Sequence, residues 1–307
     1  MLGIQHSGRI GVPVGLLAAV LMLAPGATVQ AQDEREAAEN RGHDAELDSE
    51  HLFGFTEGSD IGAPGERELL SETTGRFGKR TGTYQALDSE LQLKLPLTES
   101  FRIAPGLAFS GHRISGVPEL PSRTSGSLDS AFLDTRNRLL NRRSAPFGLT
   151  LRVVPFVSRV DELTGQGVSG YGTRIGLLAD REIVPGKLIG AINVEYGFAT
   201  ARQLASGAVE RGSGLEVSGA LAYQVQPGLF LGGEVRYARA YEGLRLERLS
   251  GEAVYLGPTI YHAFSDRAWA SLAWSYQVSG HAVGEAGPRD LVSFERHQFR
   301  LRVGYSF

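Results

Sequence analysis

The sequence predicts an all-β fold: a transmembrane, antiparallel, up-and-down β-barrel of about 12 strands. Three observations predict it. Residues 66–307 alternate between apolar and polar residues with a period of two, and the alternating segments are long. Beyond a short apolar segment near the N-terminus, no apolar stretch approaches the ~20 residues that a transmembrane helix needs. A membrane protein with this sequence must therefore cross the bilayer with strands.

Residues 1–31 have the pattern of a signal peptide. Arg9 precedes an apolar run over residues 11–24, and small residues lead to Val29-Gln30-Ala31, after which we expect cleavage. The alternative, a helical membrane anchor, needs a longer apolar run. The mature chain is therefore expected to be exported, and its lack of cysteine excludes a disulfide framework.

Two segments precede the barrel. Residues 32–50 contain eight acidic residues against two arginines, and we expect them to form an acidic, disordered leader. Residues 51–65 are expected to form a periplasmic or lumenal N-terminal segment, in which Phe53 and Phe55 anchor an insert inside the barrel or at its mouth. The alternative is an approach to the first strand that has no function of its own.

The barrel is expected to take up residues 66–307. Its clearest strands come in pairs that flank a short turn, such as Gln226-Pro227-Gly228 between residues 215–225 and 229–238. A helix with a period of 3.6 residues could not keep the apolar and polar sets of these segments on separate faces. The predicted strands lie near residues 66–77, 84–97, 101–112, 128–140, 147–160, 170–183, 187–201, 214–225, 229–241, 252–264, 267–280 and 295–307.

The predicted links alternate in length along the chain. The short ones are residues 98–100, 141–146, 184–186, 226–228 and 265–266. The longer ones are residues 78–83, 113–127, 161–169, 202–213, 242–251 and 281–294. Outer-membrane barrels have short periplasmic turns and longer extracellular loops, so both termini are expected on the periplasmic side.

The C-terminal segment ends on an aromatic residue. Its apolar positions are Phe299, Leu301, Val303, Tyr305 and Phe307. These five alternate with Arg300, Arg302, Gly304 and Ser306. This pattern resembles the C-terminal assembly signal of bacterial outer-membrane β-barrel proteins, a class that includes porin-like channels. The resemblance implies a location in the outer membrane, contact with lipid and lipopolysaccharide, and recognition by the barrel assembly machinery.

Function has to be sought on the polar face of the strands. Charged side chains cost several kcal/mol each in hydrocarbon, so the interior must be water-filled or salt-bridged. The third to sixth strands carry mainly basic residues on this face, and the seventh to ninth mainly acidic ones. Closure of the barrel would set Arg300 and Arg302 beside Glu68 and Glu72. The candidate pore-lining residues are Glu72, Glu90, Lys94, Arg102, Arg136, Arg138, Arg152, Arg174, Glu195, Glu216, Glu234, Arg236, Arg300 and Arg302.

Two interiors fit these charges. The first is a passive channel for small polar or charged solutes through a narrow, charged lumen. Small interior residues such as Ala191, Ala220 and Ala222 favour it, because they leave volume that larger side chains would fill. In the second, the same charges pair across the lumen, plug it and leave a non-conducting structural barrel.

A third, weaker alternative is an outer-membrane lipid-modifying enzyme. Its candidate residues are Ser110 with His112, two positions apart on one strand face, and His262. This spacing arises often by chance, so we expect no enzyme activity. We also expect no cofactor, no metal site and no nucleic-acid partner, because the sequence lacks metal-ligand spacing and aromatic-rich basic clusters.

Overall fold

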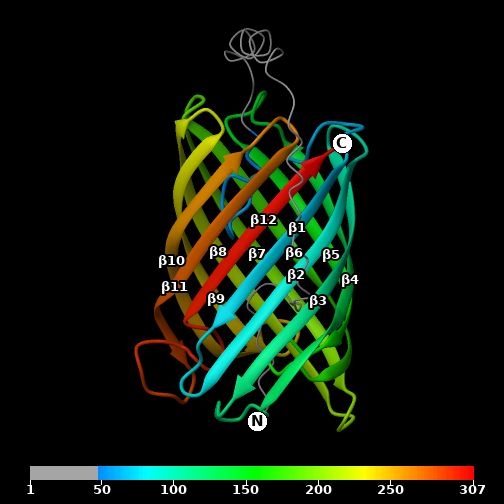
Figure 1. Ribbon diagram of the computed structural model, residues 1–307, viewed down its shortest axis with the longest axis vertical. Coiled ribbons are helices and arrows are strands. Elements are labelled where there is room, and N and C mark those ends of the chain that lie inside the picture. The colour runs from blue at the N-terminus through cyan, green and yellow to red at the C-terminus, as the bar shows by residue number, and fades with distance from the viewer. Residues whose placement is uncertain (1–47) are drawn as a thin grey trace, which may run out of the picture.

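The structure, a computed structural model, describes residues 48–307. These residues form one closed barrel in which each strand pairs antiparallel with its neighbours in sequence, and β1 pairs with β12 (Figure 1). The predicted signal peptide and most of the predicted acidic leader lie outside the described residues. Among residues 48–307, no helix is long and apolar enough to cross a membrane.

The barrel confirms the predicted fold class and the predicted number of strands. Its strands are β1 (Glu68–Phe77), β2 (Thr83–Pro96), β3 (Phe101–Ser115), β4 (Arg123–Leu140), β5 (Gly148–Val160), β6 (Gly167–Val184), β7 (Leu188–Gln203), β8 (Val209–Gln226), β9 (Leu229–Glu242), β10 (Arg248–Ala263), β11 (Ala268–Ala282) and β12 (His297–Ser306).

The two faces of the wall differ as the alternation predicts. Large apolar residues such as Leu221 and Val303 are about half exposed on the outside, where lipid would cover them. The predicted assembly-signal residues share this outer face, and all five are exposed: Phe299, Leu301, Val303, Tyr305 and Phe307. Polar and charged side chains on the alternate positions point inward and are mostly buried.

Several strands extend beyond the predicted boundaries. The backbone of β4 pairs from Arg123, that of β8 from Val209 and that of β10 from Arg248, each several residues before the apolar alternation begins. Hydrogen bonding between strands continues past the apolar band, whereas the sequence pattern reports only the band. The predicted contrast between short and long links is therefore weaker than expected: apart from residues 283–296, every link has seven residues or fewer. The predicted order is nevertheless kept except at the turn between β4 and β5, which has as many residues as the link between β3 and β4.

Both ends of the barrel are closed by chain that folds inward. We call the end with the start of β1 and the C-terminus the terminal end, and the opposite end the far end (Figure 1). Residues 48–61, which we call the plug, lie inside the terminal half of the lumen. At the far end, residues 161–166 and the second half of the loop at residues 283–296 pack inward, and Glu162, Phe294 and Glu295 are buried there.

Candidate functional site

The plug is the central feature of the lumen. Every residue from 49 to 59 is buried, although none of them belongs to a strand. The plug carries four carboxylates and no lysine or arginine. Its surroundings are the inward-facing side chains of strands on all sides of the barrel.

Glu50 lies against the basic wall. Its carboxylate Oε1 is 2.6 Å from Arg102 Nη1, 2.9 Å from Lys94 Nζ and 3.4 Å from Arg136 Nη1. Burial alone would raise the pKa of the Glu50 carboxyl, but Arg102, Lys94 and their neighbours outweigh it and hold this pKa well below the usual value of 4.5. Glu50 is therefore held in the lumen as a charged group.

Glu57 lies deeper and binds three arginines from three strands. Arg136 of β4 pairs with Oε2, while Arg152 of β5 and Arg302 of β12 lie 3.4 and 3.3 Å from Oε1. The backbone at Glu57 is fixed as well, because its N–H donates to Asn193 Oδ1 (2.7 Å) and its carbonyl accepts from Asn193 Nδ2 (2.8 Å). One carboxylate thus satisfies cations that converge from different parts of the wall.

The acidic wall holds the other side of the plug. The backbone N–H of Phe55 donates to both oxygens of Glu234 (3.0 and 2.9 Å), and that of Thr56 donates to Oε2 (3.0 Å). The plug therefore turns its carboxylates toward basic strands and its amide groups toward an acidic strand. The separation of charge predicted along the wall matches this orientation.

The Phe55 ring lies between two guanidinium groups. Arg236 of β9 and Arg300 of β12 place their Cζ atoms 3.8 and 4.1 Å from the ring centroid. Contacts of this length are cation–π interactions, which strengthen when the groups are removed from water. Phe55 and Glu57, two residues apart, thus bind to a continuous set of arginines.

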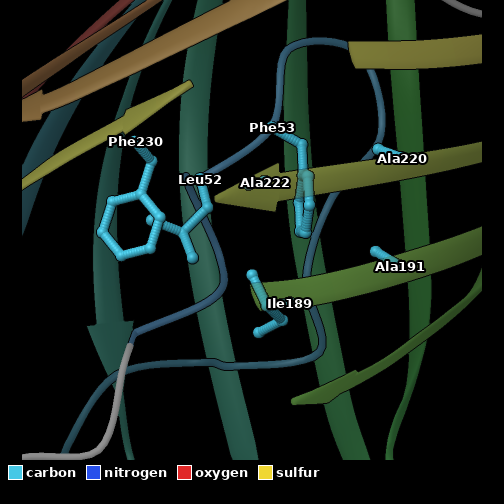
Figure 2. Packing of buried hydrophobic residues seen from close by; sticks show 7 residues of the cluster. All are labelled: Leu52, Phe53, Ile189, Ala191, Ala220, Ala222 and Phe230. Carbon is cyan, nitrogen blue, oxygen red and sulfur yellow. The ribbon is translucent and has the colours of Figure 1, made fainter. Parts of the chain in front are cut away.

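Small wall residues make room for the apolar part of the plug. Leu52 and Phe53 pack against Ile189, Ala191, Ala220, Ala222 and Phe230 (Figure 2). Gly54 lies so close to Ala273 that a side-chain carbon at position 54 would collide with the Ala273 methyl group. The volume that the small residues leave open is filled by the plug in this region.

The base of the plug is tied to the turns at the terminal end. Arg142, in the turn between β4 and β5, donates to Asp60 at 2.6 Å and to Asp180 at 3.2 Å. Asp180 also accepts from the Ser59 N–H (2.6 Å) and from the Ser49 hydroxyl. The start of the plug, at Ser49, and its end, at Ser59 and Asp60, are therefore bound to the same two side chains of the barrel.

The predicted seam between the first and last strands forms only in part. Glu72 lies opposite Arg302 in the register and binds it at 2.7 Å, and it also lies 3.3 Å from Arg300. Glu68 does not bind either arginine in the described contacts. It lies opposite Ser306, and it pairs instead with Lys94 at 2.8 Å.

All candidate pore-lining residues occupy alternate, inward-facing strand positions. Arg138, Glu195 and Glu216 are half-buried, and the other eleven are buried. Many meet at the plug, and several also pair within the wall. Asp134, on the same inner face, binds Arg152 at 2.7 Å and Arg136 at 3.3 Å. A small cavity beside Phe55 and Glu57 has room for about one or two water molecules.

The sequence prediction missed the plug's own ligands. Glu50 was assigned to the leader and Glu57 to no role, and Asn193, Asp180 and Arg142 were not singled out. The four carboxylates of the plug were the available signal, because an acidic segment entering a barrel with a basic wall must pair with it.

The far end is closed by different contacts. Phe294 packs against Ala238, Ala240, Ala253 and Tyr255. Glu295 lies 3.1 Å from Lys79, and its carbonyl accepts from the Tyr255 hydroxyl (2.6 Å).

Two of the enzyme candidates, Ser110 and His112, lie beneath the other inward-folded loop, whereas His262 lies near the terminal end of β10 against Phe264. His112 Nε2 donates to the Glu162 carbonyl (2.9 Å), and both His112 and Ser110 are buried. No hydrogen bond joins Ser110 to His112 among the contacts of residues 48–307, so the geometry does not form a nucleophile–base pair.

Residues 45–307 match the family described as "Family of unknown function (DUF6662)". Among solved structures, the chain is similar to a COG4313 outer-membrane channel from Pseudomonas putida F1, with 14% identity, a TM-score of 0.57, and coverage of 81% of this chain and 98% of that one. It is also similar to the β-domain of the Bordetella autotransporter BrkA, with 12% identity, a TM-score of 0.50, and coverage of 79% and 100%. No curated protein sequence matches the chain.

These similarities concern the fold. They confirm the predicted resemblance to bacterial outer-membrane β-barrels in fold, and the apolar outer wall is of the kind that faces lipid in such barrels. A channel and an autotransporter domain share this architecture, so the function has to be argued from the lumen.

Proposed function

The chain belongs to the DUF6662 family, and we propose that it is an outer-membrane channel for small polar or charged solutes, closed at rest by its own plug. In this proposal the terminal end is periplasmic, the signal peptide is removed after Ala31, and the terminal aromatic strand directs assembly. Solutes pass when the plug leaves the lumen.

One observation carries the proposal: the terminal half of the lumen is filled by a separate segment, while the wall around it keeps small side chains. A barrel built only for structure fills its interior with side chains of its own strands, as small barrels do. Here Ala191, Ala220 and Ala222 leave a space that the plug takes up. A wall shaped around a removable segment supports a gated channel.

The kind of contact supports the same conclusion. The plug is held mainly by ion pairs and hydrogen bonds, for which water and mobile ions are substitutes when the plug leaves. Within residues 48–307, the only covalent connection between the plug and the barrel wall runs through β1. A segment held in this way is able to leave without breaking the hydrogen bonds between strands.

The second candidate is a non-conducting structural barrel. The closure of the far end favours it, as does the pair between Arg152 and Glu195 (3.2 Å), whose strands are separated by β6. In that case the plug would be a permanent part of the interior.

Single-channel recording of the full mature chain in a planar bilayer separates the two functions. We expect the wild type to be closed most of the time, with brief openings. The double variant Glu50→Gln, Glu57→Gln should be open for much longer, because the two plug carboxylates that bind the basic strands most closely lose their charge. The control is Glu66→Gln, the same change at an exposed position outside the plug.

A double variant that folds but never conducts would overturn the channel proposal if shortening residues 283–296 in the same chain also produced no current. Conduction only after that loop is shortened would retain the channel and assign the dominant closure to the far end.

A further inference from the structure

We propose that the plug mimics a solute: Phe55 and Glu57 occupy a lumenal binding site for an aromatic carboxylate, and binding of such a compound displaces the plug. This inference rests on the proposed function, because it names the class of solute that the closed channel would admit.

The carboxylate part of the site is defined by what it already holds. Arg136, Arg152 and Arg302 converge on the Glu57 side chain. All three are buried, so the site is built within the wall rather than at a mobile surface. Guanidinium groups bind planar carboxylates through directed, charge-assisted hydrogen bonds. A free carboxylate would meet the same donors once Glu57 had left.

The aromatic part of the site is defined by Phe55. Its ring is held between the guanidinium groups of Arg236 and Arg300. A site selective only for charge has no need of two cations within about 4 Å of the centre of one ring. This arrangement selects a π face in addition to a negative charge.

The spacing of the two parts is set by one strand. Arg300 contacts the ring and Arg302 contacts the carboxylate, and these residues lie two apart on the inner face of β12, about 7 Å from each other. In a small molecule with a short chain between ring and carboxylate, these two groups are closer together than the two arginine positions on β12. The arginine side chains are long and flexible, so both can reach such a molecule at once. The cavity beside Phe55 and Glu57 leaves room for a substituent on such a molecule.

Three glutamates on the other side of the site restrict where an anion can bind in the lumen. Glu234 binds backbone N–H groups of the plug, and Glu216 lines the cavity with Glu195. These carboxylates, on β7, β8 and β9, repel the carboxylate of a bound ligand. The ligand carboxylate is therefore confined to Arg136, Arg152 and Arg302. The site therefore has a defined orientation for its ligand.

The test uses the full chain with the changes Phe55→Ala and Glu57→Gln, which remove the ring and the charge but keep the plug. The probe is 3-phenylpropionate, and binding is measured by isothermal titration calorimetry. We expect one saturable site, with affinity about tenfold higher than that for propionate, which lacks the ring. It should exceed that for 3-phenylpropan-1-ol, which lacks the charge, by at least as much. Adding Arg302→Gln should weaken binding of 3-phenylpropionate.

A folded double variant that binds no 3-phenylpropionate, or binds propionate as tightly, would overturn the inference. If the double variant does not fold, the wild type decides it: 3-phenylpropionate should raise the open fraction in single-channel records, and propionate at equal concentration should not. Equal effects of the two acids would overturn the inference.

The two proposals fail separately. Conduction in potassium chloride without selective binding of 3-phenylpropionate retains the channel and rejects the aromatic-carboxylate site. Selective binding without conduction in any variant retains the site and rejects the channel.

Discussion

The plug and the far-end loops close the same lumen by different physical means. The plug is acidic, and charged arginines from several strands hold it. The loop at residues 283–296 is joined to the wall at both ends and is anchored by Phe294 in an apolar cluster. The plug also buries Leu52 and Phe53 in an apolar cluster, so what distinguishes it is its additional charged groups. Water and salt ions can replace the partners of these groups once the plug has left the lumen, whereas removal of the Phe294 ring leaves only a cavity. In the proposed channel, the terminal end would therefore be the one that opens, and the far end would be the more permanent constriction.

The largest expected effect tests the ionic side of this comparison. Changing Arg136 and Arg152 to Gln removes two of the three arginines on Glu57 and two partners of Asp134. Breaking such buried pairs should destabilise the closed barrel by roughly 3–5 kcal/mol, and the plug should leave more often. Unfolding in urea within detergent micelles measures the first effect, and single-channel recording the second.

The control for this pair is Arg248→Gln, at an arginine exposed at the far end. It should change neither property, because exposed ion pairs contribute little. If the Arg136 and Arg152 variant kept full stability and remained closed, the plug would not be held by ion pairs.

The next effect tests the apolar side. Phe294→Ala should destabilise the inward fold of residues 283–296 by ~3–5 kcal/mol, because it leaves a cavity against Ala238, Ala240 and Tyr255. Hydrogen–deuterium exchange should become faster in this loop and stay slow in residues 49–59. Equal acceleration in both segments would show that the two closures are coupled rather than independent.

A smaller effect tests how closely the plug fits the wall. Gly54→Ala places a methyl group against Ala273, and overpacking of this kind should weaken plug binding by about 1–3 kcal/mol. Gly197→Ala is the matched control, since the same methyl group there meets only ordinary contacts in the lumen. Open fractions in single-channel records compare the two. Equal values would mean that the wall does not select the shape of the plug.

The smallest effect concerns pH. The pKa of Glu50 is well below 4.5 in the closed lumen, because nearby cations outweigh the cost of burial. In the released plug, the Glu50 carboxyl would have its usual pKa of 4.5. The contribution of Glu50 to closure is therefore complete above pH 4.5, and it is lost as the pH falls from there toward the lowered pKa of the closed state. The open fraction should stay constant from pH 7 to about 5 and rise below 4.5, by at most tenfold per pH unit from this group. A rise centred near pH 6 would assign the closure to another group.

The sequence was sufficient for the wall and insufficient for what fills it. Alternation such as that around Leu221 and Val303 repeats in nearly every strand, so strand identity, the two faces and barrel closure could all be predicted. It is weakest in β1, where Ser71 and Thr73 stand at outward-facing positions. The pairing of Glu72 with Arg302 followed from closure alone. Strand ends at Arg123 and Val209 were missed because hydrogen bonding leaves no mark in the hydropathy pattern.

The plug itself follows no periodic pattern. Phe53 and Phe55 suggested an insert, but the partners of Glu50 and Glu57 come from five strands, β2 to β5 and β12, and depend on the depth to which the segment enters. Contacts of this kind are set by the closed barrel, and no spacing in the sequence reports them.

The central claim is that the plug leaves the lumen when the channel opens, and a single introduced cysteine tests it most directly. The chain has no cysteine, and Thr56 is fully buried with a hydroxyl that makes no hydrogen bond among the described residues. In Thr56→Cys, a bulky, charged thiol reagent should react only during openings and then prevent the plug from returning, so conductance should rise and stay high. Ser110→Cys, also buried but beneath the far-end loop at residues 161–166, should show no such rise. Complete modification of Cys introduced at Thr56 with no change in conductance would contradict the account.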